Sequence, residues 1–279
     1  MKLILGDNQF FGINHNDLQK GLQSKTKFGD EVKIEEFIKK SIDLGLDGFM
    51  INSNDLGYKL ISNYSPMNKE EIHYSIPYPH KYASMVNENG MLSLLKFFIS
   101  KTSILLLLRT LPKFVITQNV KHLMPLTVNL EIPKSLTKGS TVYLQNIVTD
   151  LILGLKRFDL LETFSKEIRR KGYKPGLITL NPLILDSYIK KSKVLNKEDV
   201  TICFNINQSG FNVFPNKESV NEFAVSTHKY KLMGMSIFSS GGGDIEKSTK
   251  FIKSLKLNYA VFGSSKLVNI QSNINSLSN

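Results

Sequence analysis

Short apolar runs alternate with amphipathic stretches along most of the chain. Apolar runs at Lys2–Leu5, Gly48–Ile51 and Ile72–Ile76 predict three strands. Val32–Leu44 carries apolar residues at helical spacing among charged ones and predicts a helix between the first two strands. Five further strands are expected at Val142–Gln145, Gly176–Leu180, Val200–Ile206, Leu232–Phe238 and Tyr259–Phe262. Eight strands alternating with helices predict an α/β fold, a (β/α)8 (TIM) barrel that residues 1–279 form as a single domain.

The segment between the third and fourth predicted strands departs from this alternation. Residues 91–140 are expected to form a helical insertion or lid after strand 3, with a helix at Met91–Phe98. Ile104–Leu108 is strongly apolar and flanked by basic residues, but it is too short to span a bilayer. Buried packing is the favoured interpretation, and peripheral membrane contact through residues 99–115 is the alternative.

The last part of the chain, Leu232–Ile274, reads as strand, glycine turn and helix, twice in succession. Asp244 is placed to cap the first of these helices. Each glycine turn puts free backbone N–H groups beside a helix N-terminus, which favours an anion. Two such turns late in a barrel sequence predict the phosphate-binding loops after strands 7 and 8, although each turn alone could serve only to reverse the chain. The residues assigned to this site are Ser240, Gly241, Gly242, Gly243, Gly263, Ser264, Ser265 and Lys266.

Polar side chains follow nearly every predicted strand, at the end where barrel enzymes place their chemistry. Asp7 and His80 are the first acid/base candidates, because a carboxylate and an imidazole can each take up and release a proton. The full set of catalytic candidates is Asp7, His80, Lys81, Tyr82, Tyr58 and Tyr78. The substrate-binding candidates are Asn8, Gln9, His15, Asn52, Gln145, Asn146, Asn181 and Asn205.

Composition narrows the classes of function. The formal charge is +12, yet the lysines are scattered and no basic run is interleaved with aromatic residues, so a nucleic-acid partner is not expected. The charge is compatible with the anionic, phosphate-bearing small molecule that the two glycine turns predict. The single cysteine, Cys203, excludes an internal disulfide and predicts a cytoplasmic location. The five histidines lack metal-ligand spacing, and no metal is expected.

The two ends of the chain resemble the aldo-keto reductase superfamily. Leu5-Gly6 followed by Phe11-Gly12 is similar to that family's first strand and turn, and residues 263–274 are similar to its final loop and helix. The resemblance implies a barrel fold and an NADPH site near the C-terminus. The residues it implies for NADPH binding are Ser265, Lys266, Asn269 and Asn273.

The catalytic residues of that family are not reproduced. The family uses Asp, Tyr, Lys and His, whereas this chain has Asn52 at the aspartate position, Pro77-Tyr78 at the lysine position and Gln145-Asn146 at the histidine position. Because amides do not titrate, the favoured hypothesis is non-redox acid/base chemistry on a sugar phosphate or nucleotide. The alternatives are an NADPH-dependent oxidoreductase with a rearranged relay through Tyr58 or Tyr78, and a non-catalytic binding barrel.

A second resemblance rests on two short motifs. Gly6–Gly12 reads GDNQFFG and Pro77–Tyr82 reads PYPHKY, and both are similar to motifs shared by a set of bacterial barrel proteins. This resemblance implies the barrel fold and points to no particular reaction.

Overall fold

Eight parallel strands close into a barrel in the order β1 to β8, with β8 returning to pair with β1. The computed structural model describes residues 1–12, 18–67, 69–78, 87, 89, 96 and 99–278. The strands are β1 (Lys2–Leu5), β2 (Gly48–Asn52), β3 (Glu71–Ile76), β4 (Thr141–Leu144), β5 (Lys174–Thr179), β6 (Thr201–Asn205), β7 (Lys231–Met235) and β8 (Tyr259–Phe262). The predicted (β/α)8 barrel is therefore confirmed.

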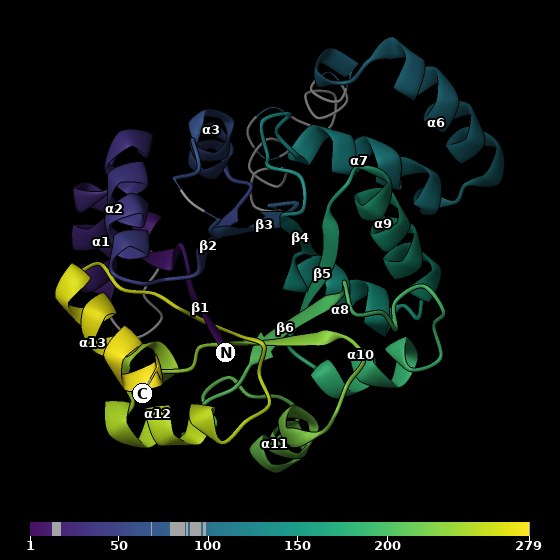
Figure 1. Ribbon diagram of the computed structural model, residues 1–279. Helices are drawn as coiled ribbons and strands as arrows, with labels where there is room; N and C mark the ends of the chain where they lie inside the picture. The colour runs from purple at the N-terminus through teal and green to yellow at the C-terminus, as the bar shows by residue number, and fades with distance from the viewer. Residues whose placement is uncertain are drawn as a thin grey trace.

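Helices surround the strands on the outside of the barrel (Figure 1). The α-helices whose bounds lie within the described residues are α1 (Leu18–Lys27), α2 (Glu31–Asp43), α3 (Asp55–Asn63), α6 (Ile104–Thr117), α7 (Met124–Glu131), α8 (Asn146–Gly154), α9 (Phe158–Arg170), α10 (Pro182–Ile189), α11 (Lys217–Val225), α12 (Ile245–Lys253) and α13 (Leu267–Ser278). The described part of the chain also contains the short 3-10 helices η1 (Asn8–Phe10), η2 (Val120–Leu123) and η3 (Ser239–Gly241). Local signals set several boundaries: Gly45 follows α2 at φ +108°, and the Asp244 carboxylate caps α12 as predicted.

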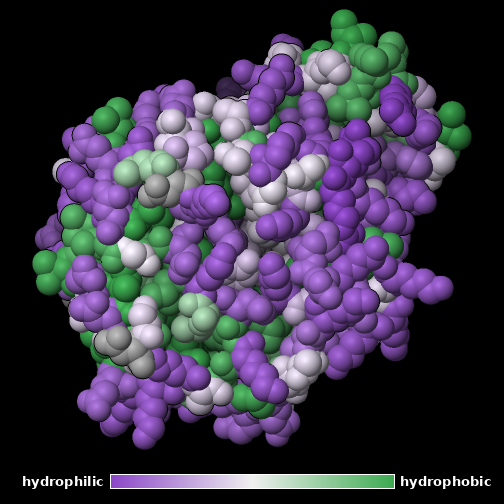
Figure 2. All heavy atoms as spheres, in the orientation of Figure 1, coloured by the Kyte–Doolittle hydropathy of each residue, from purple (hydrophilic) through white to green (hydrophobic). Residues whose placement is uncertain are grey.

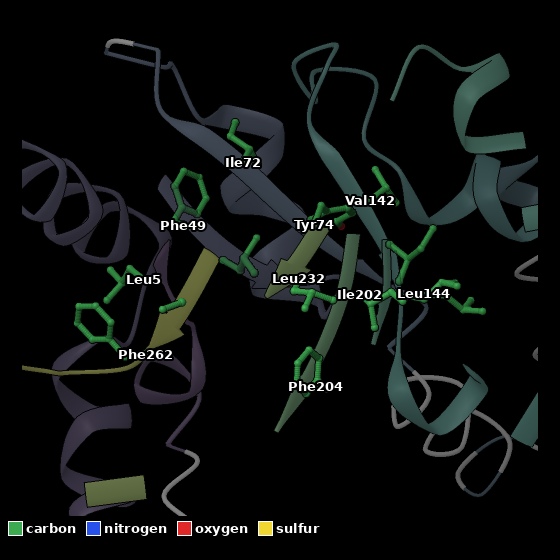
Figure 3. Packing of buried hydrophobic residues seen from close by; sticks show 14 of the residues in the cluster. Leu5, Phe49, Ile72, Tyr74, Val142, Leu144, Ile202, Phe204, Leu232 and Phe262 are labelled. Atoms are coloured by element: carbon green, nitrogen blue, oxygen red, sulfur yellow. The ribbon is translucent and has the colours of Figure 1, made fainter. Parts of the chain in front are cut away.

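Alternate strand residues face the helices and the barrel interior. The outward residues form the main hydrophobic core, and Figure 3 shows members of it such as Leu5, Phe49, Tyr74 and Phe262 lying along neighbouring strands. The inward residues form a second, smaller cluster inside the barrel. Its buried members are Ile4, Tyr143, Ile178, Cys203, Met233, Tyr259 and Val261. This filled interior makes the barrel a packed core, so a ligand is expected at its mouth.

The N-terminal end of the barrel interior is closed by a polar cluster. His73 is fully buried, with Nδ1 2.9 Å from the hydroxyl of Tyr143 and Nε2 3.6 Å from Glu71. Glu71 also pairs with Lys2. Burial lowers the pKa of His73, and the interaction with the adjacent His73 ring lowers that of Glu71. This end of a barrel serves stability, so we assign the cluster a structural role.

Gly176 is required by the close approach of Tyr143 inside the barrel. A β-carbon at Gly176 would lie 2.3 Å from Cδ1 of Tyr143, whose ring is fully buried. We expect Gly176→Ala to lower the free energy of unfolding by about 1–3 kcal/mol, because the ring has no room to move. Gly154→Ala, where a β-carbon meets nothing within 4 Å, is the matched control and should not destabilise. Equal urea midpoints for the two variants would contradict this packing.

The apolar segment Ile104–Leu108 opens α6, and its predicted burial is wrong. The side chains of Ile104 and Leu105 are 75% and 79% exposed. The barrel in this region is covered by α7, whose Leu126 and Val128 are buried and which packs against α9. α6 packs on η2 and α7 and lies outside the ring of helices (Figure 1), so little of its surface is needed for the core. Most of the helix expected at residues 91–98 lies outside the described residues.

None of the helices in the described part of the chain combines the length and the apolar character needed to cross a membrane.

Candidate active site

A buried carboxylate lies at the C-terminal end of β1. The side chain of Asp7 is 6% exposed. Its Oδ2 accepts hydrogen bonds from the backbone N–H of Asn52 at 2.7 Å and from the Asn52 side-chain Nδ2 at 2.8 Å. Burial raises the pKa of Asp7 to about 6, against the lowering effect of these hydrogen bonds. A carboxyl group with this pKa can both accept and release a proton near neutral pH.

Asn52 connects this carboxylate to the fourth strand. β2 ends at Asn52, whose Oδ1 accepts a hydrogen bond from Nε2 of Gln145. Gln145 directly follows β4 and is 8% exposed. Gln145 therefore donates a hydrogen bond to Asn52, and Asn52 in turn donates to Asp7. Three residues predicted from three different strand ends thus form one network.

Tyr78 lies near Asp7 beyond the end of β3. It is half-buried, and its pKa is raised first by burial and then by the negative charge of Asp7. The phenol therefore stays protonated and can act as a donor. Tyr58 lies instead near Tyr74, whose pKa it helps to raise. The remaining early candidates, His15, His80, Lys81 and Tyr82, lie outside the described residues.

A second buried carboxylate, not predicted from the sequence, lies behind this network. Glu131 is the last residue of α7 and is 1% exposed. It accepts a hydrogen bond from the hydroxyl of Ser53, which directly follows Asn52. We infer that Glu131 fixes the β2–α3 loop and so supports Asn52. No local pattern marks this pair, because 78 residues separate its members.

The turn after β8 lies beside Asp7 because β8 pairs with β1. Within the described residues, Oε1 of Gln9 has no hydrogen-bond partner although the side chain is only 7% exposed. Its Nε2 donates to the carbonyl of Gly6 at 2.5 Å. A β-carbon at Gly263 would lie 2.6 Å from Oε1, so Gln9 reaches directly to the glycine turn. A buried polar atom without a hydrogen-bond partner calls for an explanation. A hydrogen-bond donor on a bound ligand would provide it.

Two acidic side chains lie at the N-terminus of α12, directly after the glycine turn of Gly241–Gly243. The Asp244 carboxylate accepts a hydrogen bond from the backbone N–H of Lys247 at 3.0 Å, and Glu246 lies in the first turn. Gly241, at φ +86°, and Gly242 are exposed, while the Ser240 side chain is not described. Two carboxylates at a helix N-terminus disfavour a bound phosphate.

The turn before α13 carries positive charge instead. α13 has no acidic residue in its first turn, and the exposed Lys266 directly precedes it. The hydroxyl of Ser264 accepts a hydrogen bond from the backbone N–H of Lys266 at 3.2 Å. Nζ of Lys27, at the end of α1, donates to the carbonyl of Ser265 at 2.5 Å. Lys27 was not predicted, because 238 residues separate it from this turn. This helix N-terminus suits an anion.

Some predicted substrate-binding residues organise loops. Asn181 caps α10 by accepting a hydrogen bond from the backbone N–H of Ile184 at 3.2 Å. Nδ2 of Asn205 donates to the carbonyl of Asn212 at 3.0 Å, and its Oδ1 accepts from Ser236 at 2.8 Å. Asn205 therefore ties together the loops after β6 and β7.

The other predicted amides differ in exposure. Asn8 in η1 and Asn269 in α13 are exposed, whereas Asn146 at the start of α8 is half-buried. Asn273 is 8% exposed, so of the two asparagines predicted on α13 only Asn269 is open to a ligand from solvent.

The chain shares its architecture with aldo-keto reductases. A candidate aldo-keto reductase from Pseudomonas aeruginosa matches with a TM-score of 0.55 and 12% identity, covering 99% of this chain and 89% of that one. The holo form of an aldo-keto reductase from Bacillus halodurans matches with a TM-score of 0.53 and 10% identity, covering 100% and 87%. No protein-family model matches the chain, and no curated protein matches its sequence. At these identities the likeness establishes the fold alone, since barrels host many reactions.

Proposed function

We propose that the protein is an enzyme that binds a phosphate-bearing small molecule at the mouth of the barrel and performs acid/base chemistry without hydride transfer. The observation that carries the proposal is the buried Asp7 carboxyl, with a pKa raised to about 6, beside a positively charged helix N-terminus. Sugar phosphates and nucleotide sugars fit this pairing, because they carry an anionic group and exchangeable protons on one molecule.

The N-terminus of α13 is the proposed phosphate site. Backbone N–H groups of its first turn would donate to the phosphate oxygens, and Lys266 would supply charge. The Gly263 turn lets the ligand approach the backbone closely. The partnerless Oε1 of Gln9 would accept a hydrogen bond from a ligand hydroxyl.

Asp7 is the proposed proton acceptor. Above about pH 6 it is mostly ionised and can take a proton from the substrate, then return it in a later step. Asn52 holds the carboxylate in place, and Gln145 holds Asn52. The protonated phenol of Tyr78 would donate to the substrate oxygen on which negative charge develops.

NADPH-dependent reduction is the second candidate, favoured by the fold shared with the holo form of a reductase. The α13 turn fits a cofactor phosphate on the same grounds as any other phosphate, through Ser265 and Lys266, with Asn269 exposed alongside. When bound, the cofactor would supply a hydride. Tyr78 would then be the proton donor, since it is protonated and lies near Asp7.

A thermal-shift screen separates the two candidates. The purified protein is tested with glucose 6-phosphate, UDP-glucose, NADPH, NADP and NADH. A ligand present at about 100 times its dissociation constant stabilises by about 2.7 kcal/mol, which raises the melting temperature measurably. We expect a phosphosugar or nucleotide sugar to give the shift and Lys266→Gln to abolish it. Lys250→Gln, an exposed lysine of α12, is the matched control and should keep it.

The outcomes are distinct. A shift with NADPH alone, accompanied by its oxidation in the presence of a carbonyl compound, would establish the reductase instead. The absence of a shift with every phosphate-bearing compound, or a shift that survives in Lys266→Gln, would overturn the proposed site.

A further inference from the structure

One side of α6 presents a continuous apolar surface to solvent. An α-helix turns by about 100° per residue, which places Ile104, Leu105, Leu108, Val115 and Ile116 within one third of its circumference. Their exposed fractions run from 63% for Val115 to 81% for Ile116. Figure 2 shows hydrophobic residues gathered at the corner of the molecule that α6 occupies in Figure 1. Exposed apolar patches of this kind mark interaction sites.

The opposite side of α6 explains how the helix is held. Leu106, Leu107, Leu111 and Phe114 are half-buried, and α6 packs on η2 and α7. Ser103 caps the helix, with its hydroxyl oxygen accepting a hydrogen bond from the backbone N–H of Leu106 at 3.3 Å. The apolar surface is thus carried on a helix anchored to the barrel, so its exposed residues are not needed for that packing.

Basic residues border this apolar surface. Arg109 and Lys113 are exposed and follow the apolar third around the helix circumference. The sequence between positions 90 and 130 contains five lysine or arginine residues and no aspartate or glutamate. A charge bias of this kind is complementary to an anionic surface.

We propose that α6 docks the protein on the surface of an anionic lipid bilayer, lying in the plane of the interface with its apolar third among the acyl chains. Exposed leucine and isoleucine bordered by lysine and arginine is the arrangement of interfacial helices. A second copy of the chain fits less well. Two copies meeting through this surface would bring Arg109 and Lys113 of each toward the other, with no acidic residue in the segment to pair with them. This inference is independent of the chemistry at the barrel mouth.

The chain contains no tryptophan, which gives the test a clean reporter. Leu108→Trp places the only indole on the apolar third of α6, and Val268→Trp places it on α13 at a site that is 79% exposed. The full-length variants are mixed with vesicles of phosphatidylcholine containing about 30% phosphatidylserine, and with vesicles of phosphatidylcholine alone. We expect the emission of Leu108→Trp to move to shorter wavelength only with the anionic vesicles, and that of Val268→Trp to stay unchanged.

Cosedimentation with the same vesicles tests separately what the basic residues and the apolar residues of α6 contribute to binding. We expect Arg109→Gln combined with Lys113→Gln to lower the vesicle partition coefficient about thirtyfold, through lost attraction to the anionic surface. Leu105→Ser combined with Ile116→Ser should abolish binding, while the matched control Val268→Ser should not change it. Circular dichroism of each variant is the check that it is folded.

Three results would overturn the inference. They are no sedimentation of the wild-type protein with anionic vesicles, equal binding to neutral vesicles, or binding unchanged by the two α6 double variants. A dimer in solution that the Leu105→Ser and Ile116→Ser variant dissociates, without vesicle binding by the wild type, would assign the surface to a second copy of the chain.

Discussion

Replacing Asp7 by asparagine is expected to remove the largest single pH dependence of stability near the active site. The pKa of Asp7 is raised from 3.8 to about 6 by burial, so the folded state holds this proton more tightly than the unfolded chain does. The contribution of Asp7 to the free energy of unfolding is therefore largest below about pH 4, falls as the pH rises toward 6 and stays low above pH 6. A shift of about two pH units corresponds to about 3 kcal/mol.

Urea unfolding at about pH 4.5 and pH 7.5 measures this effect. The difference between the wild type and Asp7→Asn isolates Asp7, because other titrating groups such as Glu71 and His73 are present in both proteins. Asp43→Asn, which changes an exposed carboxylate at the end of α2, is the control and should leave the wild-type profile intact. Parallel profiles for the wild type and Asp7→Asn would show that the carboxylate does not titrate near pH 6.

The second large effect is expected for Asn52→Leu. Leucine has nearly the same shape but removes the side-chain donor to Asp7 and the acceptor for Gln145, while the backbone N–H at position 52 still donates to Asp7. Asp7 and Gln145 are both buried. The Gln145 amide left without its acceptor costs about 1–3 kcal/mol, and the lost hydrogen bond to the carboxylate about 1.5–3 kcal/mol, so we expect a loss of about 2–5 kcal/mol at neutral pH. The pKa of Asp7 should also rise, because the hydrogen bonds from Asn52 lower it.

Asn8→Leu is the matched control for this change. Asn8 lies one residue after Asp7 but is exposed, and we expect its replacement to alter stability by no more than about 0.5 kcal/mol. A wild-type urea midpoint in Asn52→Leu would mean that the network of Gln145, Asn52 and Asp7 contributes nothing to the fold.

The barrel could be predicted from the sequence because each of its strands and helices is encoded by a short, continuous stretch of residues. A short apolar run predicts a strand, and an amphipathic run with a capping residue predicts a helix, without reference to the rest of the chain. The largest error in a predicted strand boundary, at the end of β7, also has a cause in a single residue. β7 was expected to run to Phe238 but ends at Met235, because Ser236 adopts φ +59°, a left-handed conformation that extended strands do not contain.

From the sequence, the residues of the candidate site could be assigned to the ends of separate strands, but their contacts with one another could not be predicted. Asp7, Asn52 and Gln145 were each expected at the polar rim, but their connection crosses 45 and 93 residues. Neither Lys27 at the α13 turn nor Glu131 behind Asn52 has any local signature. The burial of α6 was predicted wrongly for the opposite reason. Its sequence is locally apolar, but α7 already covers that part of the barrel.

One measurement tests directly whether Asp7 and the α13 turn form a single site. Aspartate side-chain carboxyl resonances are followed by 13C NMR over pH, with the Asp7 signal assigned by its loss in Asp7→Asn. The titration is repeated with the phosphate compound that gives the largest thermal shift. We predict a carboxyl titrating near pH 6 whose pKa rises further when the ligand is bound, because a phosphate at the α13 N-terminus adds negative charge beside it. An Asp7 that titrates near pH 4, or whose titration the bound ligand leaves unchanged, would contradict the proposed site.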